Sequence, residues 1–290
     1  MIKVVEVNNI CKRYGKCNVL SDVSFQIQKG SICGFVGKNG AGKTTMLRIL
    51  TGLQKADSGE YNTFIDNLGA IVETPAFYPE MTAEENMRQL FRIKGRCSFD
   101  GIEELLNTVG LEHVKEKKVK DFSLGMKQKL GLAMALEGEP EFIILDEPMN
   151  GLDPQGIILL RKLILNLNRE KGITFLISSH MLEELTKVAT HYIFIDNGCI
   201  IRQMTAEELE KECKRTLCIT VTNQAAAEET LQKRQITYDV MQPYKLNIHS
   251  KITITDLVIA LKEQGCEVLR CYEQDENLEE FFVSMLEERV

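Results

Sequence analysis

The residues from Gly37 to Thr44 have the types and spacing that suit phosphate binding. Their sequence, GKNGAGKT, fits the pattern G-x-x-x-x-G-K-[ST] and lies between a strand-like run and a helical stretch. Glycines permit a tight turn whose N–H groups converge on phosphate oxygens, and the positive end of the following helix favours the same anion. Lys43 can reach the β- and γ-phosphates of a nucleotide, and the Thr44 hydroxyl can bind Mg²⁺. A chance match in a glycine-rich turn is the alternative, and the strand–loop–helix context argues against it.

Two acidic residues stand at the end of an apolar run. Phe142–Leu145 is followed by Asp146 and Glu147. A buried parallel strand delivers such residues to the carboxyl edge of its sheet, where ligands bind in these folds. We expect Asp146 to hold Mg²⁺, directly or through water, and Glu147 to polarise an attacking water. Alone, the pattern also fits a strand that enters a solvated loop, but the phosphate loop favours the catalytic interpretation.

The elements that must position these residues alternate between strands and helices. Thr82 and Ser123 are placed to cap helices at their N-termini. Asn197-Gly198 predicts a hairpin turn after a buried strand. Helix is expected over 43–50 and in most of 82–136, and strands are expected over 2–8, 22–28, 31–36, 68–72, 142–145, 174–178 and 192–195. This order predicts an α/β protein built on a parallel sheet.

The last 75 residues differ from the rest in charge and in element order. Of the net charge of −7, six units fall after residue 215, where 13 acidic residues outnumber seven basic ones. Expected elements are strand, helix, strand, strand, helix, strand and a final helix over 277–289. The first six make a β-α-β-β-α-β order, a split-βαβ pattern typical of ferredoxin-like domains. We therefore expect a small α+β domain over 216–290.

Composition excludes several classes of protein. The chain has 290 residues, 44% hydrophobic and 27% charged, an ordinary globular balance. Its acidity argues against nucleic acid as a partner. No apolar run of about 18 residues is present to span a bilayer, and the N-terminus lacks the apolar stretch of a signal peptide. The nine cysteines, scattered without a C-x-x-C pair, are typical of reduced cytosolic thiols.

Further residues resemble the motifs of ABC-transporter ATPase subunits. Phe122–Gln128, with the sequence FSLGMKQ, stands where that family has its LSGGQ signature and keeps Ser123 and Gly125. It has Leu124 and Met126 where the family usually has Gly and Gln. Gly151-Leu152-Asp153 stands at the place of the family's D-loop. His180 matches the switch histidine, and Tyr14 matches the aromatic residue that stacks on adenine.

The resemblance covers roughly residues 2–215 and implies a P-loop NTPase cassette fold. That fold has a parallel sheet core, an antiparallel β subdomain and a helical subdomain, here about 74–136. We accordingly expect an ATPase domain over 1–215 and an accessory domain over 216–290. The stretch between Gly59 and Leu68 is shorter than usual in the family, which leaves the edge of the antiparallel subdomain open.

The resemblance also implies an ATP- and Mg²⁺-dependent enzyme that acts as a head-to-tail dimer. Each signature would cover the nucleotide of the second copy. Glu147 and His180 would be catalytic, and Thr44, Asp146 and Glu73 would bind the metal. Nucleotide contacts would come from Tyr14, Gly37, Lys38, Asn39, Gly40, Ala41, Gly42, Lys43, Thr44, Thr45, Ser123 and Gly125. Separate integral membrane permease subunits would hold the chain on the inner face of the cell membrane, in the cytoplasm.

Glu73 stands where the family usually has the Q-loop glutamine. With the following Pro75–Pro79 segment it resembles the ATPases of bacitracin- and lantibiotic-type exporters. Phe77 and Tyr78 would contact the permease or pack inside the helical subdomain. The function expected from the resemblance is therefore an exporter ATPase for an antimicrobial peptide or antibiotic. An importer ATPase, a soluble non-transport ABC ATPase and an ATP-dependent regulator remain alternatives.

Overall fold

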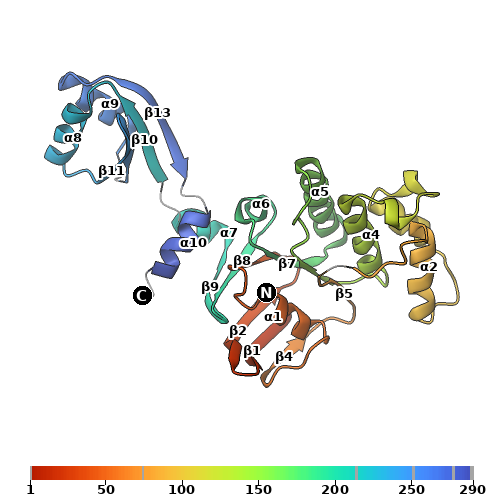
Figure 1. Ribbon diagram of the computed structural model, residues 1–290. Coiled ribbons are helices and arrows are strands. Elements are labelled where there is room, and N and C mark those ends of the chain that lie inside the picture. The colour runs from red at the N-terminus through yellow and green to blue at the C-terminus, as the bar shows by residue number, and fades with distance from the viewer. Residues whose placement is uncertain (1, 74, 213–214, 250–251, 276–277, 288–290) are drawn as a thin grey trace. The chain divides into compact units, whose positions relative to one another are not determined.

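A computed structural model describes residues 2–73, 75–212, 215–249, 252–275 and 278–287 (Figure 1). Thr74, the first residue expected in the helical subdomain, lies outside the described residues, as do positions 277, 288 and 289 of the expected last helix. The chain divides into two compact units, residues 1–206 and 207–290. This division falls nine residues before the position expected from the sequence, because the charged helix α7 (Ala206–Glu212) belongs mostly to the second unit.

The first unit is organised around a mainly parallel sheet. In the described part of the chain this sheet has six strands in the order β5-β6-β7-β3-β8-β9. The predicted parallel pairing of the buried strands is confirmed, and β9 runs antiparallel to β8 across the Asn197-Gly198 turn. Both turn residues have positive φ angles, as a tight hairpin requires. The strands are β3 (Ile32–Val36), β5 (Leu68–Ile71), β6 (Phe142–Asp146), β7 (Thr174–Ser179), β8 (His191–Asp196) and β9 (Cys199–Thr205).

A second sheet in this unit is antiparallel, with the order β2-β1-β4 among the described residues. Its strands are β1 (Lys3–Tyr14), β2 (Cys17–Gln28) and β4 (Ser58–Thr63). The strands β1 and β2 extend well beyond the expected runs 2–8 and 22–28, because they continue as a hairpin to the Tyr14↔Cys17 pair. The tip of that hairpin, residues 13–18, is exposed, so no apolar alternation marked it in the sequence.

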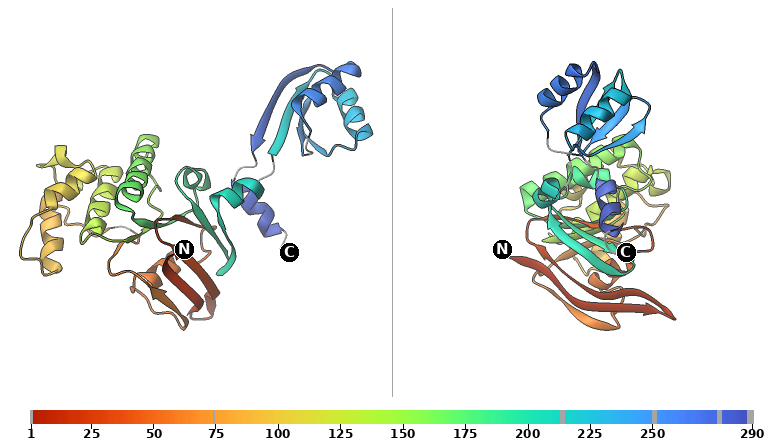
Figure 2. Two further views of the ribbon diagram at one scale, coloured as in Figure 1. Left: turned by 180° about the vertical axis from the view of Figure 1, so that it is seen from behind. Right: turned by 90° about the vertical axis from the view of Figure 1, so that its left-hand side faces the viewer.

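Helices of the first unit connect and flank these strands. Both predicted caps are confirmed, since Thr82 forms a capping box with Glu85 and the Ser123 hydroxyl accepts the Met126 N–H. In Figures 1 and 2 α4 lies between α5 and the α2–α3 pair. The helices are α1 (Lys43–Leu50), α2 (Ala83–Ile93), α3 (Ile102–Thr108), α4 (Leu124–Leu136), α5 (Pro154–Lys171) and α6 (Leu182–Thr186), with 3₁₀ turns at Glu112–Val114 and Val119–Asp121.

The second unit contains its own antiparallel sheet in the order β11-β12-β10-β13, counting the described strands. Two helices, α8 (Gln224–Lys233) and α9 (Ile254–Glu263), lie on the same face of this sheet (Figures 1 and 2). Leu231 and Leu261 from these helices pack on Ile219 and Leu246 in a separate hydrophobic core. The remaining elements are β10 (Arg215–Val221), β11 (Tyr238–Gln242), β12 (Lys245–Ile248), β13 (Val268–Asp275) and α10 (Leu278–Glu287).

Candidate active site

The glycine-rich loop links the buried strand β3 to α1, as its sequence predicts. Two of its glycines have no room for a side chain. A Cβ on Gly37 would lie 2.4 Å from the Ile195 carbonyl oxygen. Gly42 has φ of 103°, and a Cβ there would lie 2.8 Å from the Val19 carbonyl oxygen. The loop is therefore held tightly against β2 and β8, with its conformation fixed by packing as well as by backbone freedom.

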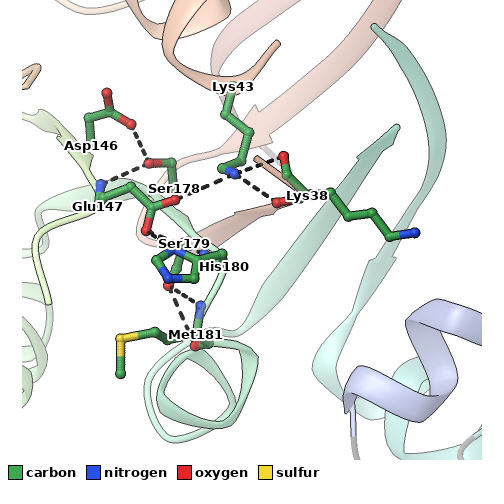
Figure 3. A network of polar contacts seen from close by, with 9 residues as sticks. Lys38, Lys43, Asp146, Glu147, Ser178, Ser179, His180 and Met181 are labelled. Atoms are coloured by element: carbon green, nitrogen blue, oxygen red, sulfur yellow. Dashed lines mark hydrogen bonds and ion pairs between the residues drawn. The ribbon is translucent and has the colours of Figure 1, made fainter. Parts of the chain in front are cut away.

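Lys43, the first residue of α1, directs its side chain back into the loop (Figure 3). Its Nζ donates hydrogen bonds to the carbonyl oxygens of Gly37 at 2.7 Å and Lys38 at 3.3 Å. The same ammonium lies 3.4 Å from Oε1 of Glu147. The Lys43 side chain is only 6% exposed, so its charge is balanced by these oxygens and not by bulk water.

The acids Asp146 and Glu147 lie at the carboxyl edge of the sheet, where β6 ends. Asp146 is buried, and its Oδ1 accepts a hydrogen bond of 2.5 Å from the hydroxyl of Ser178 on β7. Glu147 has φ of 48°, an uncommon conformation for a residue with a side chain. This turn out of the strand carries its carboxylate away from Asp146 and toward the lysine.

His180 follows β7 and faces Glu147 (Figure 3). Its Nδ1 lies 2.8 Å from Oε2 of Glu147, and its backbone N–H donates to the same oxygen at 3.3 Å. The Glu147 carboxylate is thus held by a lysine on one oxygen and by the histidine on the other. This arrangement can orient a water molecule and accept a proton from it.

A cleft of about 410 Å³ opens over this network. Tyr14 lines it beside the loop, with its hydroxyl donating to Oε1 of Gln54 at 2.5 Å. Val19 and Asn150 also line it and were not expected from the sequence, although Asn150 stands only three residues after Glu147. The expected residues that line the cleft are Tyr14, Asn39, Gly40, Gly42, Lys43, Thr44, Thr45, Glu147 and His180. Gly37, Lys38 and Ala41 lie in the loop but do not line the cleft, and neither does the buried Asp146 at the end of β6.

Three other expected residues lie away from this cleft. The carboxylate of Glu73 forms an ion pair with Arg48, on α1, and does not line the cleft. Ser123 and Gly125 lie at the N-terminus of α4, where the Ser123 hydroxyl caps its own helix. Within one chain, therefore, the signature does not reach the phosphate loop.

Oxygen donors for a cation are present on two elements. Thr44 lines the cleft at the start of α1, and Asp146 is hydrogen-bonded through Oδ1 at the end of β6. A hydroxyl and a carboxylate are hard oxygen ligands that fit Mg²⁺, which binds proteins through few ligands and takes the rest from water and phosphate. The described residues contain no group of three or more His, Cys, Asp or Glu that could hold a metal by themselves.

Comparisons with known proteins decide the family. A family model described as ABC transporter matches residues 20–150. The bacitracin transport ATP-binding protein BcrA of Bacillus licheniformis is 36% identical over 99% of this chain and 98% of its own. The chain belongs to the ABC transporter ATP-binding family. The lantibiotic transport ATP-binding protein SrtF of Streptococcus pyogenes is 41% identical over 72% of this chain and 91% of its own.

Solved ABC cassettes share the fold of this ABC ATPase. The ADP conformation of the cassette MJ1267 aligns with a TM-score of 0.65 and 26% identity, over 72% of this chain and 93% of that one. A dimeric cassette, MJ0796 with ADP and phosphate, aligns with a TM-score of 0.62 and 25% identity, over 70% of this chain and 98% of that one. The predicted cassette fold and the family of transporter ATPases that bind and hydrolyse nucleotide are thereby confirmed. In the described residues, no helix is both long and apolar enough to cross a bilayer.

Proposed function

We propose that this chain energises the export of an antimicrobial peptide or antibiotic, with bacitracin as the favoured cargo. The observation that carries the proposal is the extent of the match to BcrA, which includes the second unit as well as the cassette. The match to the lantibiotic protein covers 72% of the chain, about the length of the cassette alone. A second unit shared with the bacitracin proteins supports that cargo over a lantibiotic.

The proposed hydrolysis follows from the network around Glu147. ATP enters the cleft with its adenine on Tyr14 and its phosphates on the loop and Lys43. Because the phosphates attract the Lys43 ammonium, the Glu147 carboxylate is released to orient and polarise water against the γ-phosphate. His180 holds the second carboxylate oxygen and contacts the γ-phosphate. Thr44 and Asp146 would hold Mg²⁺, which would supply positive charge to the phosphates, and Glu73 would join them if its pair with Arg48 opened.

The proposed active form is a head-to-tail dimer. Ser123 and Gly125 lie away from their own chain's cleft, at a helix N-terminus that suits an anion. Placed over the cleft of a second copy, they complete its γ-phosphate site. The dimeric cassette MJ0796 supports this arrangement for the family.

Membrane permeases are the proposed second partners, with the chain attached to the inner face of the cell membrane. A hollow of about 300 Å³ beside α2 is lined by Phe77 and Tyr78, and Tyr78 is half exposed. An exposed aromatic side chain beside a hollow suits contact with a partner helix. Tyr78→Asp should then prevent co-purification of the permease without lowering the ATPase rate of the isolated chain.

Two measurements test the proposal. Purified wild-type chain should hydrolyse ATP with Mg²⁺, whereas Glu147→Gln should bind ATP, lose turnover and accumulate as a dimer. In the host cell, disruption of the gene should raise susceptibility to bacitracin, and wild-type but not Glu147→Gln should restore resistance. An unrelated antibiotic serves as the control. Turnover by Glu147→Gln would refute the catalytic assignment, and unchanged susceptibility to bacitracin would refute the cargo.

A further inference from the structure

Ser178 is a completely buried hydroxyl that touches both acids of the site. Its Oγ donates to Oδ1 of Asp146 at 2.5 Å and accepts the backbone N–H of Glu147 at 2.8 Å. A serine hydroxyl has one proton to give and lone pairs to accept with, so both roles are filled at once. Among the described residues, Ser178 is the only hydrogen-bond partner of the Asp146 side chain.

The register of the sheet places this serine beside the acids. Asp146 on β6 is paired with Ser178 on the parallel neighbour β7. After Asp146 the backbone leaves the strand, because Glu147 adopts φ of 48°. At that point the Glu147 N–H is shared between the Ser178 carbonyl oxygen, at 3.2 Å, and the Ser178 hydroxyl. The hydroxyl therefore supports a strained backbone position as well as a carboxylate.

These contacts orient the two acids, of which Glu147 lines the cleft and Asp146 is buried and does not line it. With Oδ1 of Asp146 tied to the serine, the rotation of that carboxylate is fixed and its other oxygen is left for a cation or its water. With the Glu147 N–H held, the Glu147 side chain starts from one backbone geometry toward Lys43 and His180.

We propose that Ser178 is a positioning residue that sets Asp146 for Mg²⁺ and Glu147 for water in the same contact. This assignment rests on the proposed use of the two acids in ATP hydrolysis. Residues that orient a metal ligand through a hydrogen bond change metal affinity or activity by about 10–100-fold when they are removed. The serine acts through the acids and does not itself touch the nucleotide.

The sequence contained a signal for this role that the family motifs do not use. Ser178 stands two residues before His180, inside β7, whereas His180 follows the end of that strand. From this strand end the serine reaches Asp146 and the Glu147 N–H, and the histidine reaches the Glu147 carboxylate. Ser179 is turned away and accepts the Met181 N–H at 2.9 Å.

The test compares Ser178→Ala with Thr174→Val. Thr174 is equally buried at the opposite end of β7, and its hydroxyl accepts the Gly30 N–H at 2.9 Å. Both variants lose one hydroxyl from the same strand. Binding of trinitrophenyl-ATP is measured by fluorescence in EDTA and then across a MgCl₂ titration, and thermal unfolding is recorded for each variant.

For Ser178→Ala we expect nucleotide binding in EDTA to stay within about twofold of wild type, since the phosphate loop is intact. The Mg²⁺ midpoint, the concentration that gives half of the Mg²⁺-dependent change in nucleotide binding, should rise about 10–100-fold. The Mg²⁺ concentration needed for hydrolysis should rise to match. Thr174→Val should keep the wild-type Mg²⁺ midpoint even if its unfolding temperature falls. Equal Mg²⁺ midpoints in wild type and Ser178→Ala would overturn the assignment.

Two further outcomes are distinguishable. If Ser178→Ala does not fold, the same titration is made with Ser178→Cys, because a thiol is of similar size to the hydroxyl and is a weaker hydrogen-bond donor. An unchanged Mg²⁺ midpoint in Ser178→Cys overturns the assignment, and a raised midpoint supports it. If wild type itself fails to bind or hydrolyse nucleotide, the proposed function has failed, and the role of Ser178 falls with it.

Discussion

The ammonium of Lys43 lies 3.4 Å from the carboxylate of Glu147, so the lysine of the glycine-rich loop and the proposed base form an ion pair. Both side chains are largely shielded from water, at 6% and 22% exposure. Each charge therefore stabilises the other. In the proposed mechanism, phosphate would replace this internal pair by a lysine–phosphate pair and leave the carboxylate available for water.

The first prediction concerns Lys43→Met. Removal of the ammonium takes away a phosphate contact and leaves Glu147 without its cation. Loss of one partner of a shielded charge pair such as the lysine–phosphate pair costs about 2–5 kcal/mol of binding, so ATP affinity should fall about 30-fold or more. Fluorescence titration with an ATP analogue measures this, with the exposed Lys55→Met as a matched control. Tight ATP binding by Lys43→Met would contradict the geometry.

The second prediction separates His180 from another histidine. His180→Ala should retain ATP binding and lose turnover by about 10²-fold or more, because Glu147 loses the group that holds Oε2 at 2.8 Å. In the part of the chain that the structure describes, His113 pairs only with its neighbour Glu112, and its side chain is 86% exposed, so His113→Ala should hydrolyse ATP like wild type. Steady-state phosphate release measures both. Equal rates in the two variants would remove His180 from the mechanism.

The third prediction tests the composite site of the proposed dimer. Ser123→Arg places a bulky cation at the helix N-terminus, away from its own cleft, so the isolated chain should still bind ATP but fail to hydrolyse it. A mixture of Ser123→Arg with Lys43→Met chains should recover part of the activity. In mixed dimers one site combines an intact loop with an intact signature. Activity of Ser123→Arg alone would argue against completion of the site by a second copy.

The fourth prediction concerns thiol reactivity. Burial raises the pKa of Cys33 from an ordinary 9.0 to about 12, because the thiolate is poorly solvated inside the core. Cys33 should resist iodoacetamide at pH 8 in the native protein, whereas the exposed Cys17 and Cys97 react. Since the thiolate forms more easily in the unfolded chain, alkaline pH above about 9 should favour unfolding through this group. Mass spectrometry of peptides after timed labelling gives the order of reaction.

The sequence determined the local parts of this protein. A glycine-rich loop between a strand and a helix, acids after an apolar run and caps such as Thr82 depend on neighbours within a few residues. Those patterns were sufficient for the fold class and for most of the residues that line the cleft. The length of the β1–β2 hairpin was not predicted, because its exposed tip, residues 13–18, is stabilised by strand pairing and carries no apolar alternation.

Only the tertiary structure decided which distant residues meet. Strand order brings β6 and β7 together, so that Ser178 reaches Asp146 and Glu147, and it brings Lys43 to Glu147. The same packing pairs Glu73 with Arg48 and leaves it outside the cleft, although its position in the sequence suggested a metal ligand. Contacts between strand ends depend on the register of the whole sheet, which no local pattern specifies.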